Sequence, residues 1–416
     1  MTKFEISGPN NLEGEIPVYG AKNAAMKMIA ASVMIPGKIT LNNVPDILDI
    51  QTIINILTEN GAEITRNGHT LEIDTTNLNS NDPNPDLVRK MRGSIVLIGP
   101  YLARFGKINI PQPGGCAIGS RPLDDHFNGF KQLSTKILKK DAIYYLERSE
   151  VVGKEINLCP SVTATENMIM AQTLAKGVTV IKNAAREPQI AELANFLNQA
   201  GADISGCGTS EIKINGVEKL HGLSFNVMAD PFETATFICL AISTKSNLKI
   251  TNCDPKNLPP FVEEMEKIGV KFEIGNNYIK VLNATDLKPA DISSDFYPGF
   301  STDMLPQTAL VLTQVNGVSH INEKLFEDRL GYLNELAQMG ARVKIINKHK
   351  AEITGKTKLH GKTVDSLDLR AGATLILAGL IAEGTTTINN AEIVDRGYEK
   401  IESRLQKVGA RISRIQ

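Results

Sequence analysis

The chain has 416 residues, of which 42% are hydrophobic and 22% are charged, a composition that predicts a soluble globular protein of two or three domains. Its 45 basic and 46 acidic residues give a net charge of −1, which offers no general attraction for nucleic acid or an anionic membrane surface. The longest apolar run, residues 371–382, is shorter than the roughly 20 residues of a membrane span, and we expect no membrane insertion and no secretory signal. Five scattered cysteines without a CxxC pair favour a reduced, cytoplasmic protein without a zinc site.

A strand-like run that follows a short break recurs along the whole chain, at intervals of 67 to 71 residues. A period of about 70 residues held through six copies indicates six repeats of one structural unit. The six runs are residues 37–43, 106–111, 177–183, 247–252, 317–322 and 384–390.

A second motif, a helix that ends at glycine and is followed by a strand, lies between most of these runs. In each copy we expect the glycine to adopt the left-handed conformation that stops a helix. Apolar residues at positions 50, 53, 54 and 57 have helical spacing, and strand alternation resumes between Gly61 and Asp74 around a turn at Asn67-Gly68. The expected helix-ending glycines are Gly61, Gly201, Gly269, Gly340 and Gly409.

Several helical stretches are apolar on most faces, which predicts that they are buried. Helices inside and sheets outside would be an inside-out α/β barrel, whereas the alternative is a doubly wound sheet covered on both faces. Six equal repeats favour the inside-out arrangement, and by themselves suggest a division near residue 210. The apolar stretches are residues 26–34, 168–174, 237–242, 304–312 and 375–381.

Residues 113–124 form a glycine-rich loop that carries a thiol, a guanidinium and a carboxylate, at Cys116, Arg121 and Asp124. Exposed N–H groups in such a loop favour anions, and Arg121 could stabilise a thiolate or pair with a phosphate. The alternative is an ordinary surface turn. The repeat that contains this loop has an imperfect substitute, residues 131–143, for the helix–glycine motif, which favours a functional interpretation.

Together with six other motifs, this loop resembles the enolpyruvyl transferases, and within that family the branch that acts on UDP-N-acetylglucosamine. The resemblance covers the whole chain and implies an inside-out α/β fold of two domains with three repeats each, joined by a double crossover. One domain would combine residues 1–20 with 230–416, and the other would span residues 21–229. The other motifs are residues 20–25, 91–94, 183–188, 299–304, 368–371 and 395–399.

The resemblance implies transfer of the enolpyruvyl group of phosphoenolpyruvate to the 3′-hydroxyl of UDP-N-acetylglucosamine, with release of phosphate. This addition–elimination is the first committed step of peptidoglycan synthesis and needs no metal or organic cofactor. The substrates would be the only expected partners, and the chain is expected to act as a cytoplasmic monomer.

Cys116 would be the general acid that protonates C3 of phosphoenolpyruvate, and the thiol that fosfomycin alkylates. Lys22, Arg121 and Arg396 would clamp the phosphate and carboxylate of phosphoenolpyruvate, with Arg92 and Arg370 in the same cationic site. Asn23 would offer an amide to the substrates. The alternative for Cys116 is a spare loop thiol, and for each of the three clamp residues it is a solvated surface charge.

Asp303 would contact and deprotonate the sugar 3′-hydroxyl, although its position also suits an N-cap aspartate. Asp368 precedes an apolar helix and could both cap it and take part in catalysis. The nucleotide would meet two segments, with its diphosphate at the start of the helix expected at Thr165. These nucleotide residues are Arg121, Pro122, Leu123 and Asp124, then Cys159, Pro160, Ser161, Val162 and Thr163, with Leu325 nearby and Glu187 and Arg329 as weaker candidates.

Three positions depart from the family pattern. Thr163 replaces a typical glycine and adds bulk near the expected diphosphate. Pro231 replaces a typical arginine at the crossover, and Ser301 stands where proline is usual. These departures put nucleotide affinity and hinge behaviour in question rather than the chemistry.

Two alternatives remain open at this point. One is the shikimate-pathway enolpyruvyl transferase, against which the cysteine loop and nucleotide segments count. The other is a non-enzymatic paralogue that binds a sugar nucleotide and senses precursor supply. The loop around Cys116 is further expected to close over the cleft when the nucleotide binds.

Overall fold

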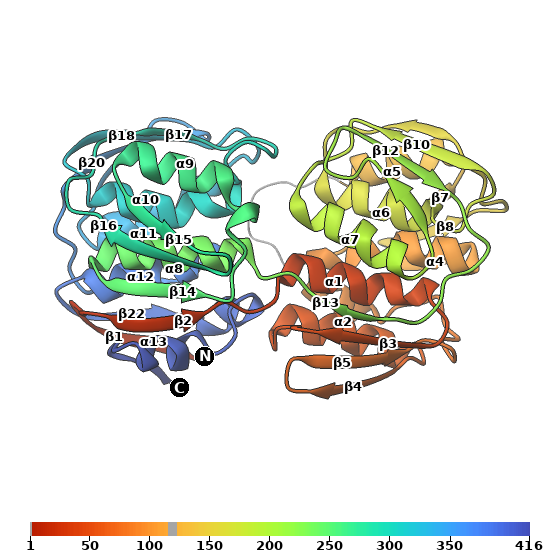
Figure 1. Ribbon diagram of the computed structural model, residues 1–416, viewed down its shortest axis with the longest axis horizontal. Coiled ribbons are helices and arrows are strands. Elements are labelled where there is room, and N and C mark those ends of the chain that lie inside the picture. Colours follow the sequence, from red (N-terminus) through yellow and green to blue (C-terminus); the bar gives the residue numbers. More distant parts are fainter. Residues whose placement is uncertain (1, 115–122) are drawn as a thin grey trace. The chain divides into compact units, whose positions relative to one another are not determined.

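The computed structural model describes residues 2–114 and 123–416, which form two compact units. The first unit contains residues 2–19 and 229–416, and the second contains residues 20–114 and 123–228 (Figure 1). The domain boundaries expected from the sequence lie one residue from these divisions. Within the described residues, no helix is both long and apolar enough to cross a membrane.

Three four-stranded sheets enclose the first unit. The first has the order β21-β22-β1-β23 (Thr363–Asp365, Gly384–Asn389, Lys3–Gly8, Ile412–Ile415). The second is β15-β16-β14-β2 (Lys271–Ile274, Tyr278–Asn283, Asn247–Thr251, Glu13–Pro17). The third is β17-β18-β20-β19 (Asp291–Ser293, Gly317–Asn322, Lys350–Gly355, Arg342–Ile345).

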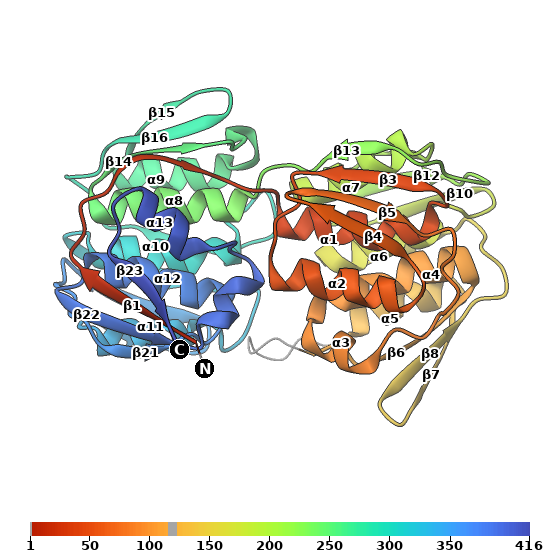
Figure 2. The ribbon, with the colours of Figure 1, turned by 90° about the horizontal axis from the view of Figure 1, so that it is seen from below.

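The N-terminal strands belong to this first unit because they complete two of its sheets. β1 lies antiparallel between β22 and β23, with Phe4 opposite Ile388 (Figure 2). β2 pairs in parallel with β14, with Ile16 opposite Ile250. The chain therefore leaves this unit after Tyr19 and returns to it at Ala229.

Three mutually packed helices occupy the centre of the first unit: α8 (Pro231–Thr244), α10 (Leu305–Thr313) and α12 (Leu369–Ile381) (Figure 1). Every residue of α10 is buried, as expected for a helix that is apolar on most faces. The helices α9 (Pro259–Ile268), α11 (Tyr332–Gln338) and α13 (Ile401–Lys407) bury only one face each.

The second unit has two four-stranded sheets and one three-stranded sheet within its described residues. The orders are β13-β3-β5-β4 (Ser224–Asn226, Lys38–Asn42, Thr70–Asp74, Glu63–Asn67), β11-β12-β10-β9 (Asp203–Ser205, Glu211–Asn215, Val178–Lys182, Glu155–Asn157) and β6-β8-β7 (Lys107–Pro111, Ile143–Glu147, Lys136–Lys140).

Buried helices α1 (Lys22–Ala31), α4 (Ile98–Phe105) and α6 (Val162–Gln172) lie inside this second unit. Helices α2 (Leu48–Glu59), α5 (Asp124–Gln132) and α7 (Pro188–Gln199) pack on them, and α3 (Pro85–Lys90) packs against α2 and β6. Each unit has its own core, built from the apolar faces of its sheets and its central helices.

The strand-like runs found in the sequence become β3, β6, β10, β14, β18 and β22. All of these except β6 lie between one parallel and one antiparallel neighbour, whereas the only strand paired with β6 in the described residues is β8. The glycines expected to end helices all have φ between 98° and 109°, which confirms that prediction. The hairpin around Asn67-Gly68 is also confirmed.

Candidate active site

A carboxylate held by two buried arginines is the main polar feature of the first unit. Asp303 Oδ1 lies 2.6 Å from Arg329 Nη2, and its Oδ2 lies 3.6 Å from Arg370 Nε. The Asp303 side chain is 27% exposed, so a ligand can reach it, whereas the two arginine side chains are 3% and 4% exposed. The alternative interpretation of Asp303 as a helix cap is wrong, because Ser301 Oγ accepts the Asp303 N–H and serves as N-cap.

Glu323 fixes the loop that precedes Arg329. Its carboxylate accepts hydrogen bonds from Ser294 Oγ at 2.8 Å and from the Leu325 N–H at 2.9 Å. It also accepts the hydroxyl proton of Thr302, whose oxygen accepts from Arg329 Nη1. Because Thr302 precedes Asp303, this network holds both sides of the Asp303–Arg329 pair, and the Leu325 backbone belongs to the same network through Glu323.

Arg370 lies in a buried polar cluster. Its Nη1 donates to the Tyr398 hydroxyl at 3.0 Å, and its guanidinium lies over the Phe232 ring. Burial alone would lower the pKa of Arg370, but Tyr398, Asp303 and the carboxylate of Asp230 raise it to a net value above its usual range. Arg329 shows the same balance: burial lowers its pKa, but Asp303, Asp368 and Glu323 together leave the pKa raised. Both guanidiniums are therefore charged.

Asp368 and Arg396 have different local roles. Asp368 caps α12, since its Oδ1 accepts the N–H groups of Arg370 and Ala371 at 2.7 Å and 3.0 Å. Arg396 ends a short 3₁₀ helix, Ala391–Arg396, and is partly buried. Capping of α12 by Asp368 is thus confirmed, and its part in catalysis stays a prediction.

In the second unit, Lys22 begins α1 and forms an ion pair with Asp49, whose Oδ2 lies 3.1 Å from Lys22 Nζ. The Asp49 side chain is 6% exposed, so this carboxylate holds the ammonium group in a nearly dry environment. Asn23 follows on the same helix and is partly buried. Arg92 begins the 3₁₀ helix Arg92–Leu97.

One turn further along α1, Lys27 forms a buried ion pair with Glu166 of α6, with Nζ 3.3 Å from Oε2. Burial raises the pKa of Glu166 to about 7, although Lys27 opposes that shift and Glu187 adds to it. Glu187 is the N-cap residue of α7. This pair joins the helix that begins at Lys22 to the helix that follows the expected nucleotide loop.

That loop, Cys159 to Ser161, leads into α6. Cys159 and Pro160 are exposed, and Ser161 caps the helix by accepting the Ala164 N–H. The helix begins at Val162 rather than near Thr165, so Val162 and Thr163 lie in its first turn, where N–H groups have no intrahelical acceptor. The sequence-based start was late because Ser161, not a later residue, supplies the cap. Leu123 is buried just before α5, and Asp124 is the exposed first residue of that helix.

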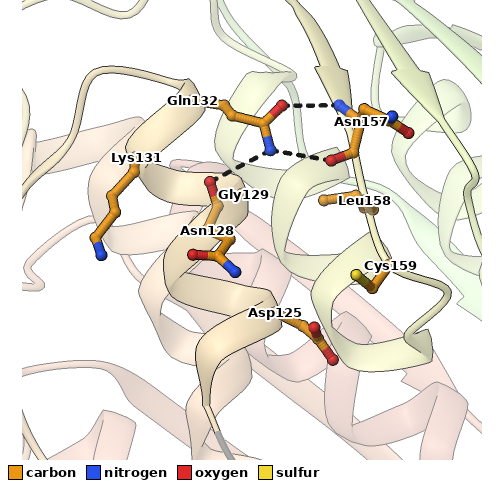
Figure 3. Close-up of a pocket in the computed structure, with 8 residues that line it drawn as sticks. All are labelled: Asp125, Asn128, Gly129, Lys131, Gln132, Asn157, Leu158 and Cys159. Carbon is orange, nitrogen blue, oxygen red and sulfur yellow. Dashed lines mark hydrogen bonds between the residues drawn. The ribbon is translucent and has the colours of Figure 1, made fainter.

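A pocket of about 400 Å³ lies between α5 and this loop (Figure 3). Gln132 and Asn157 close one end of the pocket through two hydrogen bonds of 2.9 Å each. Cys159 points into it from the loop, and Asp125 and Lys131 line its other side from α5. The pocket therefore offers both charged and apolar surface beside the first turn of α6.

Three residues given central or neighbouring roles, Cys116, Arg121 and Pro122, lie outside the described residues, as does the expected closing loop. Cys207, Cys239 and Cys253 are at least partly buried. Burial raises the pKa of Cys207 to about 12 and that of Cys253 to about 11, which makes thiolate chemistry there unfavourable.

Several residues in these clusters were missed by the sequence interpretation. Their partners are distant in sequence, so no local pattern marks them. For Lys27 and Glu166 the sequence did offer one indication, which is a charged residue within an otherwise apolar stretch. The missed residues are Lys27, Asp49, His126, Glu166, Asn167, Asp230, Thr302, Glu323 and Tyr398.

The fold and these polar clusters belong to a known class of proteins. The family model for EPSP synthase (3-phosphoshikimate 1-carboxyvinyltransferase) matches residues 6–405. The chain belongs to this family of enolpyruvyl transferases.

More specific relatives carry another name within the family. A protein of Desulforapulum autotrophicum, named UDP-N-acetylglucosamine 1-carboxyvinyltransferase, is 40% identical over 416 residues, which is 100% of both chains. A protein of Clostridium acetobutylicum, named UDP-N-acetylglucosamine 1-carboxyvinyltransferase 1, is 42% identical with the same coverage.

Solved structures agree on the fold. The enolpyruvyl transferase NikO from Streptomyces tendae matches with a TM-score of 0.90 at 24% identity, over 99% of this chain and 98% of that one. An EPSP synthase from Acinetobacter baumannii matches with a TM-score of 0.74 at 17% identity, over 100% of both chains. The two-domain α/β fold is therefore that of the enolpyruvyl transferases.

Proposed function

We propose that this enzyme transfers the enolpyruvyl group of phosphoenolpyruvate to the 3′-hydroxyl of UDP-N-acetylglucosamine and releases phosphate, the first committed step of peptidoglycan synthesis. The names of the relatives that match over their whole length support this substrate pair. The observation that carries the proposal is Asp303, a reachable carboxylate oriented by Arg329 and Arg370. Such a carboxylate can accept the proton of a sugar hydroxyl.

In this proposal Cys116 donates the proton to C3 of phosphoenolpyruvate and is the thiol that fosfomycin alkylates. Lys22, Arg121 and Arg396 bind the phosphate and carboxylate, with Arg92, Arg370 and Asn23 in support. Lys22 suits this role because Asp49 fixes its ammonium group. Asp368 contributes by orienting the first turn of α12, which carries Arg370.

The sugar nucleotide is proposed to bind at the first turn of α6 and the start of α5. The N–H groups of Val162 and Thr163 are suited to a diphosphate. The neighbouring pocket has a volume of about 400 Å³, within the usual range for small-molecule sites. Pro122, Leu123, Asp124, Cys159 and Pro160 are its proposed neighbours, and Leu325 is a further proposed contact.

The six sheets are proposed to be copies of one repeat of about 70 residues, three in each unit, arranged as an inside-out α/β barrel. The shared pairing pattern of the central strands and the buried central helices support this arrangement. We further propose that the protein works in the cytoplasm as a monomer and needs no cofactor.

Phosphate release from phosphoenolpyruvate tests the proposed reaction, measured with UDP-N-acetylglucosamine and, separately, with shikimate 3-phosphate. We expect release only with the sugar nucleotide, and its loss after fosfomycin treatment. C116A should abolish turnover while nucleotide binding persists, and C116D should keep activity and resist fosfomycin. Release only with shikimate 3-phosphate would indicate the sister activity, and nucleotide binding without turnover would indicate a sensor.

A further inference from the structure

Three side chains behind the first turn of α6 form a hydrogen-bonded chain. Asn167 Nδ2 lies 3.1 Å from His126 Nδ1, and His126 Nε2 lies 3.1 Å from Thr163 Oγ1. Asn167 is fully buried and His126 is 4% exposed, whereas Thr163 is partly exposed. These hydrogen bonds therefore connect the core of the second unit to the proposed nucleotide site.

The orientation of the Asn167 amide is determined by two backbone groups. Asn167 Oδ1 accepts the Gly99 N–H at 2.8 Å, and Nδ2 donates to the Ile95 carbonyl at 3.0 Å. The opposite orientation would face donor to donor at Gly99 and acceptor to acceptor at Ile95, leaving buried polar groups unpaired. Asn167 Nδ2 is therefore the donor towards His126.

His126 is consequently neutral, with a single tautomer. Burial, helped by the charge of Arg92, lowers the pKa of His126 to about 3. Its Nδ1 accepts from Asn167 and so carries no proton, which places the ring proton on Nε2. The imidazole therefore donates to Thr163 Oγ1.

Thr163 Oγ1 thus accepts a hydrogen bond from His126, and the hydroxyl proton of Thr163 can be donated to another group. His126 is the hydrogen-bonding partner of Thr163 Oγ1 within the described residues. Thr163 is the second residue of α6, where helix N–H groups also point outward. A hydroxyl donor beside such N–H groups adds to the attraction of an anion.

We propose that Thr163 is an affinity-determining residue, whose hydroxyl donates a hydrogen bond to the diphosphate of the sugar nucleotide. This inference rests on the proposed function, because it assumes that the nucleotide binds at the first turn of α6. The Thr163 side chain therefore contributes a directed donor at this position. Asn167 and His126 are positioning residues, since they set the direction of this donor.

Three variants test the role of Thr163 by steady-state kinetics with each substrate varied in turn. T163V keeps the shape of the side chain and removes the donor, and should raise KM for UDP-N-acetylglucosamine about tenfold or more. T163S retains the hydroxyl and should restore KM to near the unaltered value. The control is T173V, because Thr173 is buried at the C-terminal end of α6 and its hydroxyl donates to the Ile169 carbonyl at 2.8 Å.

The substrate whose KM rises in T163V identifies the anion that binds to Thr163. Because phosphoenolpyruvate also carries phosphate, a rise confined to its KM would overturn the assignment to the nucleotide. Unchanged KM values in T163V would overturn the inference while leaving the proposed function intact. Failure of the unaltered enzyme to turn over UDP-N-acetylglucosamine would instead contradict the proposed function.

The tautomer of His126 supplies a second, independent measurement. Imidazole ¹⁵N chemical shifts should show a proton on Nε2 and none on Nδ1, unchanged between pH 5.5 and 8. H126Q identifies the resonance by its disappearance. A protonated Nδ1, or titration of the ring within that range, would contradict the proposed direction of the Thr163 hydroxyl.

Discussion

Asp303 and Arg329 form a close ion pair in the candidate site of the first unit, with 2.6 Å between Oδ1 and Nη2. Arg329 also donates to Thr302, which in turn donates to Glu323. The carboxylate is thus fixed from one side by a buried cation, while its side chain stays 27% exposed. A group that is both oriented and reachable is suited to removing a proton from a bound hydroxyl.

Replacing Asp303 by asparagine should lower kcat about 100-fold or more, because an amide cannot accept the proton. KM for each substrate should change much less. The matched control is Asp295→Asn, since Asp295 pairs with Lys324 at 3.1 Å on the surface and is 51% exposed. A kcat for Asp303→Asn within threefold of the unaltered enzyme would remove Asp303 from the proposed chemistry.

Arg329→Lys tests whether the orientation of Asp303 matters apart from its presence. Lysine keeps the charge but loses the planar fork that reaches both Asp303 and Thr302. We expect kcat to fall about tenfold with the thermal midpoint lowered by a few degrees. A lower midpoint with unchanged kcat would show that Arg329 only stabilises the fold.

In the second unit, the Lys22–Asp49 pair allows the positioning of Lys22 to be tested separately from the binding of substrate. Asp49→Asn should lower kcat severalfold without raising KM for phosphoenolpyruvate, since the carboxylate positions the ammonium but repels an anionic substrate. Initial rates at varied phosphoenolpyruvate concentration measure both parameters. Asp86→Asn is the control, because Asp86 is 88% exposed in a surface pair with Arg89. A large rise in KM with constant kcat would contradict the positioning role.

Local chemistry explains which parts of the fold were predictable. Glycine ends five helices because the chain there turns left-handed, with φ of 103° at Gly61 and 98° at Gly409. The central strands were visible because one face of each is buried, which leaves an alternating pattern in the sequence. Neither feature depends on distant residues.

The partners of the site residues depend on tertiary packing instead. Asp49 is 27 residues from Lys22, and Asn167 is 41 residues from His126. Competition between neighbours also left an alternative open for Asp303, that of a helix cap. Both Ser301 and Asp303 are good helix caps, and only the backbone path makes Ser301 the cap and leaves Asp303 free to pair with Arg329.

The buried pair Lys27–Glu166 should make stability depend on pH. Burial raises the pKa of Glu166 to about 7, from 4.5 in an unfolded chain. A carboxyl group with a raised folded-state pKa contributes stability below pH 4.5, which is lost as the pH rises to 7. The difference corresponds to about 3 kcal/mol, from about 1.4 kcal/mol for each pKa unit.

Glu166→Gln removes this titration. The thermal midpoint of the unaltered protein, relative to that of Glu166→Gln, should therefore fall between pH 4.5 and 7.5, as differential scanning fluorimetry can measure. Glu155→Gln is the control, because Glu155 pairs with Lys182 at 2.9 Å and is 63% exposed, so its contribution should be small at every pH. Parallel pH profiles for the unaltered protein and Glu166→Gln would contradict the linkage.

A second buried pair, Glu233–Arg404, lies where the chain leaves and re-enters the first unit. Arg404 Nη1 and Nη2 contact the two carboxylate oxygens of Glu233 at 2.5 Å and 3.0 Å, and each side chain is 4% exposed. Glu233 also accepts the Tyr19 N–H at 2.9 Å, and Arg404 donates to the Pro17 carbonyl. The pair therefore connects α8 and α13 to the segment by which the chain leaves this unit.

Glu233→Gln should destabilise the protein by about 3 kcal/mol or more, because the buried Arg404 charge loses its hydrogen-bonded carboxylate. Glu15→Gln is the matched control. Glu15 pairs with Lys249 at 2.9 Å but is 59% exposed, so its loss should cost about 1 kcal/mol or less. Denaturant unfolding of both variants measures the difference. Equal losses of unfolding free energy in the two variants would contradict this prediction. They would mean that water reaches Arg404 after the substitution, and that the contact of α8 and α13 with the segment before Gly20 does not depend on this carboxylate.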